Sequence, residues 1–248
     1  IYYEWMMSWT GYCLTGETKD QKFNSNVGYS ASNGKTTLAE MLTKCFPIYV
    51  KKIGNKAFDL GFSGWAKCFS AFLDTPYRYI WMNEWGNHAL DEDRVCNFVD
   101  GKGFLIPVIY EKSEREVVVH GKLNTNGNND PDFKGDTKGI FRRGVSTPFE
   151  SIFCDDGTEN EAEHRYKADK SICEKFENIE YRLALFHLLV PYAKQYYEVG
   201  LTIPKECSSK FKKGIDDLDE FSVVFEHFLF YFQLYKDDVF LPLFSATE

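Results

Sequence analysis

The first half of the chain contains two stretches in which apolar residues recur at helical spacing. The apolar faces consist of Tyr2, Trp5, Met6 and Trp9 in the first stretch and of Leu38, Met41, Leu42 and Cys45 in the second. Residues three and four apart lie on the same side of a helix, so each stretch is expected to pack one face on a core. Pro47 ends the second helix because it cannot donate the backbone hydrogen bond. A shorter helix that begins with acidic residues is predicted at 91–99.

Runs rich in β-branched and aromatic residues lie between these helices and predict strands. They cover 22–27, 48–53, 77–82 and a run that ends at 153, together with a hairpin formed by 104–110 and 114–123. The Asn- and Gly-rich stretch 124–139 is expected to be a long polar loop. Strands that alternate with helices favour a three-layer α/β fold, in which helices cover both faces of a mostly parallel sheet.

The C-terminal part of the chain has a helical pattern. Two apolar stripes run along 179–192, so this helix is expected to be buried nearly all round. A Phe-rich stretch, 215–236, predicts a last helix. We place a boundary in the acidic segment before these helices. The three expected parts are a helical lead-in, 1–21, an α/β core, 22–158, and a C-terminal helical region, 159–248.

Composition and charge narrow the class of protein. The 248 residues are 44% hydrophobic and 17% aromatic, which is enough to fill a sizeable core. A net charge of −8 argues against a general basic coat for nucleic acid, although a few Lys or Arg residues can still grip phosphates. Seven Cys without C-x-x-C spacing fit single thiols in a reducing compartment. No signal peptide or membrane-spanning run is visible in the sequence.

The loop after the first predicted strand carries a nucleotide-binding motif. Residues 33–36 read NGKT, the second half of the phosphate-binding pattern G-x-x-x-x-G-K-[ST]. Such a loop holds phosphate oxygens with backbone N–H groups at the start of a helix. Lys35 is expected to bind the β- and γ-phosphates of ATP, and the Thr36 hydroxyl to ligate Mg²⁺. The predicted nucleotide-binding residues are Gly28, Ser30, Ala31, Ser32, Asn33, Gly34, Lys35, Thr36 and Thr37.

An acidic residue follows the strand predicted at 77–82. In a nucleoside triphosphatase, a carboxylate at this place holds Mg²⁺ and polarises the attacking water. Glu84 is therefore predicted as the catalytic carboxylate and as a metal ligand, with Asn83 beside it to orient water or the ion. Two positions depart from the usual pattern: Asn83 stands where a second acid is common, and Tyr29 stands where the loop has its first Gly.

Polar and basic residues further along the chain complete the candidate site. Asn126 and Asn128 are candidates for a residue that senses the γ-phosphate and positions water. Arg142 or Arg143 is predicted to reach the γ-phosphate bound by a neighbouring subunit.

The predicted hairpin carries basic residues near its tip and its base. Lys102, Lys112 and Arg115 could point into the channel of a ring and follow the backbone of single-stranded DNA. An exposed turn with Lys for solubility is the alternative interpretation.

The order of these parts resembles the superfamily 3 helicases, which are AAA+ ring motors, and among them the primase–helicases of large DNA viruses, phages and related mobile elements. The resemblance spans 9–204 and rests on an ordered set of segments. These segments are WTGYCLTG, SNGKTTL, IWMNEWG, VDGKGFLIPVIYEKS, KLNTNGNNDP, FRRGVSTPFESIF and EYRLALFHLLVPYAKQYYEVGLTIPKE. Pro107 departs from the family pattern, because many relatives carry a basic residue there.

The resemblance implies an AAA+ core that works as a homohexamer, hydrolyses ATP with Mg²⁺ between subunits and moves on single-stranded DNA. It implies a primase domain elsewhere in a longer chain, and the first residue, Ile1, also suggests an excised piece. Relatives often place the sensing Asn three residues before a Pro, which favours Asn128, whereas an ungapped count favours Asn126; we prefer Asn128. We expect an intracellular protein, in the host cytoplasm, a viral replication site or the nucleus.

Two other functions fit parts of the pattern. A P-loop ATPase of another kind, such as a packaging or remodelling motor, shares the ATP site but not the DNA-binding hairpin. A degenerate interaction domain, which binds a nucleotide or partners structurally without turnover, fits the departures at Tyr29 and Asn83.

Overall fold

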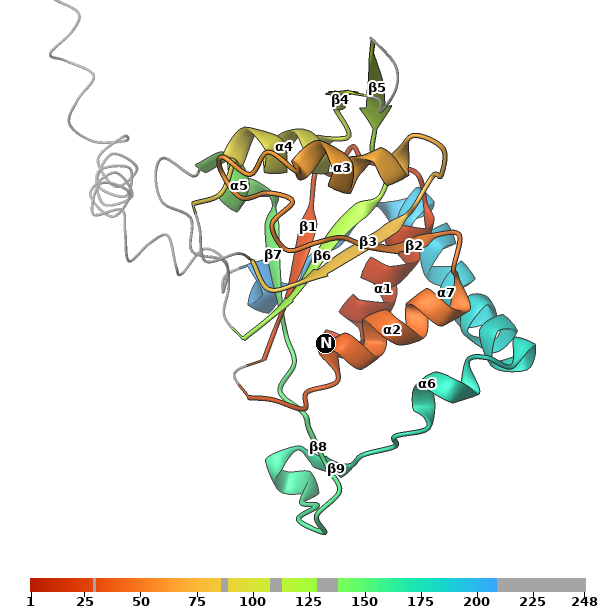
Figure 1. Cartoon of the computed structure of the whole chain (residues 1–248). Coiled ribbons are helices and arrows are strands. Elements are labelled where there is room, and N and C mark those ends of the chain that lie inside the picture. Colours follow the sequence, from red (N-terminus) through yellow and green to blue (C-terminus); the bar gives the residue numbers. More distant parts are fainter. Residues whose placement is uncertain (29, 86–88, 108–112, 129–137, 209–248) are drawn as a thin grey trace, which may run out of the picture.

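A five-stranded parallel sheet forms the centre of the computed structural model (Figure 1). The structure describes residues 1–28, 30–85, 89–107, 113–128 and 138–208. The strand order is β2-β3-β6-β1-β7, and every neighbouring pair is parallel. The strands are β1 (Phe23–Val27), β2 (Val50–Lys52), β3 (Tyr79–Asn83), β6 (Lys122–Gly127) and β7 (Gly144–Pro148). The predicted three-layer α/β class is confirmed.

Helices cover both faces of this sheet, as Figure 1 shows. On one face lie α1 (Tyr2–Leu14), α2 (Lys35–Cys45) and α7 (Ile179–Val199), and on the other α3 (Trp65–Phe69), the short η1 (Ser70–Phe72), α4 (Glu92–Asp100) and α5 (Lys138–Arg143). Each face has its own apolar core, one centred on Trp5 and Trp9 and the other on Phe58, Phe69 and Phe98. The helix expected at 91–99 begins where the Asp91 carboxylate accepts a bond from the Arg94 N–H at 2.9 Å.

Smaller elements extend from this core. The antiparallel hairpin of β4 (Gly103–Pro107) and β5 (Glu114–Val118) stands away from the main sheet (Figure 1). The remaining elements are β8 (Ile152–Cys154), η2 (Glu161–Glu163), β9 (Arg165–Lys167) and α6 (Ile172–Lys175). The hairpin is thus confirmed, but its second run ends at Val118, because the chain turns and starts a separate strand at Lys122.

The expectation of a polar loop from 124 onward is wrong for its first four residues. They belong to β6, which lies between β1 and β3 and is buried along its whole length. Its two asparagines are hydrogen-bonded inside the core: Asn124 accepts a bond from the Trp9 indole at 2.6 Å, and Asn126 accepts one from Asn26 at 2.9 Å. The loop pattern in the sequence therefore conceals a central strand.

The burial predicted for the long C-terminal helix is also wrong. In α7 only Leu189 and Tyr196 are buried, while the apolar side chains of Ile179, Leu183 and Phe186 are 61%, 49% and 44% exposed. The helix packs closely on α1, where a Cβ added at Gly11 would come within 2.7 Å of Tyr192 Cβ. The helix expected at 215–236 lies outside the described residues.

No helix within the described ranges is long and apolar enough to span a membrane.

Candidate nucleotide-binding site

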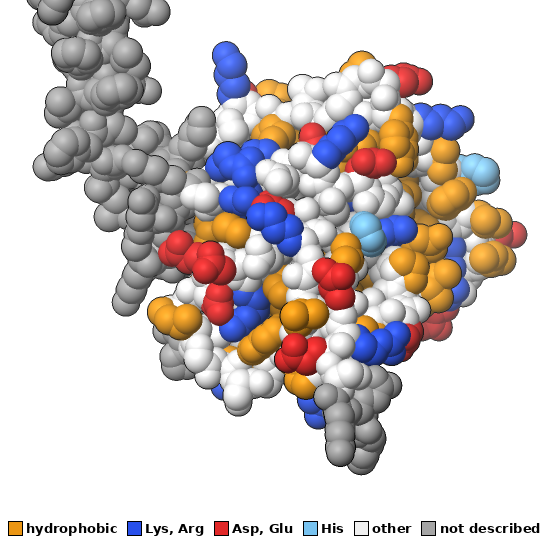
Figure 2. All heavy atoms as spheres, turned by 90° about the horizontal axis from the view of Figure 1, so that it is seen from above, with side chains coloured by type: hydrophobic (Ala, Val, Ile, Leu, Met, Phe, Trp, Pro, Cys, Tyr) orange, Lys and Arg blue, Asp and Glu red, His pale blue; other side chains and the backbone are white. Residues whose placement is uncertain are grey.

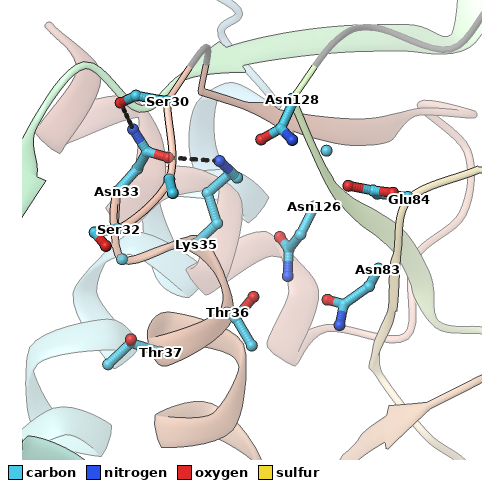
Figure 3. A pocket seen from close by; sticks show the side chains of 13 residues that line it. Ser30, Ser32, Asn33, Lys35, Thr36, Thr37, Asn83, Glu84, Asn126 and Asn128 are labelled. Atoms are coloured by element: carbon cyan, nitrogen blue, oxygen red, sulfur yellow. Dashed lines mark hydrogen bonds between the residues drawn. The ribbon is translucent and has the colours of Figure 1, made fainter.

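A pocket opens where the loop after β1 meets the ends of β3 and β6 (Figure 3). All three segments lie at the carboxyl ends of parallel strands, where open α/β sheets bind their ligands. It is lined by Ser30, Ala31, Ser32, Asn33, Gly34, Lys35, Thr36, Thr37, Asn83, Glu84, Asn126, Gly127 and Asn128. The structure therefore brings together eight of the nine residues predicted to bind nucleotide, both sensor candidates and the catalytic carboxylate. Gly127 is the lining residue that was not predicted from the sequence.

The phosphate-binding loop has the backbone shape that its sequence requires. Ser32 and Gly34 have positive φ values of 61° and 83°, and α2 begins directly after Gly34. A Cβ at Gly34 would lie 3.0 Å from the Phe153 ring, so both its backbone conformation and its surroundings favour glycine. The first turn of α2 consequently directs free backbone N–H groups toward the loop, as phosphate binding needs.

The surroundings of Gly28 show why a glycine stands one residue before the usual position of the motif. It lies outside the pocket lining, but a Cβ added there would be 2.8 Å from Lys35 Nζ and 2.8 Å from Asn33 Cγ. Gly28 thus makes room for the lysine side chain, and its carbonyl oxygen accepts a bond from Lys35 at 3.2 Å. Tyr29, the other unusual position, lies outside the described residues.

Lys35 is held in the pocket by neutral acceptors. Its ammonium donates to Asn33 Oδ1 at 2.8 Å in addition to the Gly28 carbonyl. Burial lowers the pKa of Lys35 from its ordinary value, and the negative charge of Glu84 opposes this effect. Neutral partners leave the ammonium charge uncompensated by direct contact, which suits the binding of an anionic phosphate.

Asn33 fastens the loop to the chain that follows β7. Its amide nitrogen donates to Ser30 Oγ at 3.0 Å and to the carbonyl oxygens of Phe149 and Ser151 at 3.3 and 3.4 Å. The side chain is buried, and its oxygen faces Lys35 (Figure 3). Asn33 therefore fixes both the loop and the lysine, a role that the motif alone did not reveal.

Glu84 follows β3 directly and faces the pocket from the side opposite the loop (Figure 3). Its φ of 45° is unusual for a residue with a side chain, and such backbone costs of order 1–3 kcal/mol. The Glu84 N–H donates to the Asn126 carbonyl at 2.8 Å, which holds the bend against β6. Asn83, Glu84 and Thr36 supply only hard oxygen donors and amide groups at this place, a set that fits Mg²⁺ together with phosphate oxygens.

The two sensor candidates differ in burial. Asn126 is the next-to-last residue of β6 and is 4% exposed. In Figure 3 it lies between Thr36 and Glu84. Its amide oxygen accepts a bond from Asn26, but its amide nitrogen has no partner within the described part of the chain. Asn128 is exposed at the rim of the pocket.

The arginine pair lies at the opposite end of the sheet. Both residues precede β7, whose first residue, Gly144, pairs with Phe23 at the start of β1. The loop that binds phosphate leaves the other end of β1, roughly 13 Å further along a strand of this length. Neither arginine therefore lines the pocket of its own chain.

Arg143 and Arg142 have different surroundings. Arg143 makes a double hydrogen bond to the Asp100 carboxylate, at 2.6 and 2.7 Å, and is 8% exposed. The hydrogen bonds to Asp100 raise the pKa of Arg143, although burial acts in the opposite direction. Arg143 is therefore held in place by this ion pair. Arg142 is exposed, and its guanidinium donates to Gln21 Oε1 at 2.7 Å.

The predicted DNA-binding residues lie on the hairpin and at its base. Lys102 is exposed and lies 3.4 Å from the Asp100 carboxylate, and Arg115 is exposed on β5. Lys112 lies outside the described residues. On the face seen in Figure 2, Lys and Arg side chains are interspersed with Asp and Glu, so no broad basic field covers this side. Any contact with a nucleic acid there would be local.

No group of three or more His, Cys, Asp and Glu side chains that could hold a metal ion occurs in the described ranges. A divalent ion at the pocket would therefore depend on the nucleotide for some of its ligands, as Mg²⁺ commonly does.

Comparison with known proteins shows a likeness of fold. No family model and no curated protein matches the chain. Among solved structures, it is similar to an apo form of the C-terminal region of NrS-1, with a TM-score of 0.51 and 13% identity over 84% of this chain and 43% of that one. A second apo structure of that region gives a TM-score of 0.46 and 14% identity over 84% and 42%. The first match shows a shared fold, and the chain spans less than half of the region it matches.

Proposed function

We propose that this chain is the ATPase core of a ring-shaped DNA helicase that moves on single-stranded DNA during the replication of a virus or mobile element. The single observation that carries the proposal is the pocket itself. In it, Lys35 and Thr36 face Glu84 across the end of a central strand that carries Asn126. Phosphate binder, carboxylate and polar sensor are the parts that phosphoryl transfer to water requires.

Each residue then has a defined task in hydrolysis. Lys35 and the backbone N–H groups of the loop would bind the β- and γ-phosphates, and Thr36 and Glu84 would hold Mg²⁺. When bound, the ion would neutralise charge that develops on the phosphate oxygens. The Glu84 carboxylate orients the attacking water and accepts its proton. The buried amide nitrogen of Asn126 leads us to propose this residue as the γ-phosphate sensor, in place of Asn128.

The position of the arginines supports an assembly in which sites are shared between subunits. Arg142 is exposed and far from the pocket of its own chain, so it could complete only the pocket of a neighbour. Arg143 is committed to Asp100 and supports the segment that presents Arg142. A closed homohexamer with the β4–β5 hairpin toward a central channel would place Lys102 and Arg115 near DNA. The primase domain is proposed to lie elsewhere in a longer chain.

The test is ATP turnover by the assembled protein, with and without single-stranded DNA, beside the variants Lys35→Ala and Glu84→Gln. We expect DNA to stimulate turnover, Lys35→Ala to abolish nucleotide binding, and Glu84→Gln to keep binding but lose turnover. Nucleotide binding without turnover in any assembly would refute the motor and favour a degenerate binding domain. Turnover that is insensitive to DNA and to charge reversal at Lys102 and Arg115 would favour another kind of P-loop ATPase.

A further inference from the structure

A line of buried polar side chains connects helix α1 to the pocket. The Trp5 indole N–H donates to Thr147 Oγ at 2.7 Å, and the Thr147 hydroxyl donates to Asn24 Oδ1 at 2.6 Å. Asn24 Nδ2 donates to Asn26 Oδ1 at 2.7 Å, and Asn26 Nδ2 donates to Asn126 Oδ1 at 2.9 Å. These five residues, here called the relay, cross β7, β1 and β6 and are all buried.

The direction of every bond in the relay follows from its first member. An indole nitrogen can only donate, so Thr147 accepts from Trp5 and has its own hydroxyl hydrogen left to give. That hydrogen requires the oxygen end of Asn24, which turns the amide nitrogen of Asn24 toward Asn26. The same logic turns the nitrogen of Asn26 toward Asn126. A reversed amide at any step would oppose two donors or two acceptors inside the core, which is costly.

The relay ends with a free donor at the pocket. Because the oxygen of Asn126 is occupied by Asn26, its amide nitrogen is the end that remains available. This nitrogen is buried and has no hydrogen-bond partner within the described residues, although its side chain lines the pocket. Most buried donors in proteins are satisfied, so an unpartnered donor on a residue that lines a pocket is suited to a ligand that accepts hydrogen bonds.

We propose that the relay fixes the amide of Asn126 with its nitrogen toward the pocket, so that Asn26 acts as a positioning residue for recognition of the γ-phosphate. The inference rests on the proposed function, because it takes the acceptor to be a phosphate oxygen of ATP. A donor that is already oriented stabilises charge on the transferring phosphate without reorganisation during the reaction. A freely turning amide would present its oxygen to the phosphate part of the time and repel it.

The neighbouring Asn124 provides a matched control. It lies two residues before Asn126 on the same strand, is fully buried and accepts a bond from the Trp9 indole at 2.6 Å. Its amide nitrogen donates to the carbonyl oxygens of Lys122 and Ile80, at 2.9 and 3.3 Å, so this second network ends on backbone. Substitutions at Asn26 and Asn124 thus disturb similar buried amides, and of the two it is Asn26 that donates a hydrogen bond to Asn126.

The experiment compares Asn26→Leu with Asn124→Leu in the full chain. We expect Asn26→Leu to lower kcat roughly 10- to 100-fold, less than the ~10²- to 10³-fold loss typical of removing a directed donor outright, with little change in the Kd for ATP. Asn124→Leu should keep kcat and the Kd for ATP within about threefold of the wild-type values, when the proteins are compared at the same concentration of folded protein. An unchanged kcat for Asn26→Leu, or an equal loss for both variants, would overturn the proposal.

A double variant tests whether Asn26 acts through Asn126. Asn126→Leu alone should abolish the contribution of the amide, so adding Asn26→Leu should slow turnover no further, whereas independent effects would multiply. Independent multiplication would refute the relay.

A readout without ATP separates failure of the relay from failure of the proposed function. In ¹H–¹⁵N spectra of the nucleotide-free protein, Asn26→Leu should shift the side-chain amide signals of Asn126, and Asn124→Leu should not. If the wild type fails to hydrolyse ATP but this pattern is found, the relay holds and the proposed function falls. If the Asn126 signals do not respond to Asn26→Leu, the relay is wrong whatever the ATPase does.

Discussion

Arg142 and Arg143 are neighbours in the sequence, yet their removal is expected to have different consequences. The side chain of Asp100 is 2% exposed, and among the described residues Arg143→Ala would leave its carboxylate with the exposed Lys102, at 3.4 Å, as its ion-pair partner. Breaking a buried ion pair by removing one partner costs about 3–5 kcal/mol, because the other charge stays buried. We expect a loss near the lower end, about 3 kcal/mol, since Lys102 remains.

Arg142→Ala removes one exposed hydrogen bond, to Gln21. An exposed bond of this kind contributes less than about 1 kcal/mol, so the free energy of unfolding should hardly change. If Arg142 completes a neighbour's site, turnover should fall by about 10³-fold or more, as for other arginines that act in trans.

Urea unfolding and ATP turnover of the two variants separate these roles. We expect Arg143→Ala to unfold at a much lower urea concentration than the wild type. Arg142→Ala should keep the wild-type unfolding midpoint but lose ATP turnover. Mixing Arg142→Ala with Lys35→Ala should restore part of the activity, because some mixed interfaces then pair an intact pocket with an intact arginine. Full turnover by Arg142→Ala, or wild-type stability of Arg143→Ala, would refute these roles.

Further changes follow from single contacts. Burial raises the pKa of Asp100, but the hydrogen bonds from Arg143 and Lys102 outweigh it, so the pKa is lowered in the folded state. The carboxylate therefore stabilises the fold above its unfolded pKa, and the free energy of unfolding should fall as the pH drops below about 4 and Asp100 is protonated. Asp100→Asn should flatten this part of a plot of unfolding free energy against pH. Gly28→Ala should weaken ATP binding at least tenfold, measured by titration, because its Cβ would lie 2.8 Å from Lys35 Nζ; unaltered affinity would contradict this. Gly34→Ala, at a φ of 83°, should cost about 1–2 kcal/mol of unfolding free energy and hinder phosphate binding.

Much of the site could be predicted because each of its parts is a short segment with a recognisable local pattern. The loop that contains Lys35 and Thr36 is a local motif between a strand and an amphipathic helix. Glu84 follows an apolar strand, so its place at the carboxyl end of that strand could be inferred from pattern alone.

The parts that could not be predicted depend on partners distant in the sequence. β6 reads as a loop because Asn124 and Asn126 take the places of apolar residues, and their partners Trp9 and Asn26 lie 115 and 100 positions away. The commitment of Arg143 to Asp100, 43 positions away, could likewise not be read from a pair of arginines. Such pairings belong to tertiary structure, which propensity and periodicity do not encode.

The central claim is that the pocket at the end of β1, β3 and β6 hydrolyses ATP. The most direct test measures ATP binding and turnover by Glu84→Gln beside the wild type, in the assembled protein with single-stranded DNA. We expect both proteins to bind ATP with similar affinity, and turnover in Glu84→Gln to fall by about 10²-fold or more, since the base that accepts the proton of the water is lost. Equal turnover in the two proteins would contradict the assignment of Glu84 and with it this mechanism.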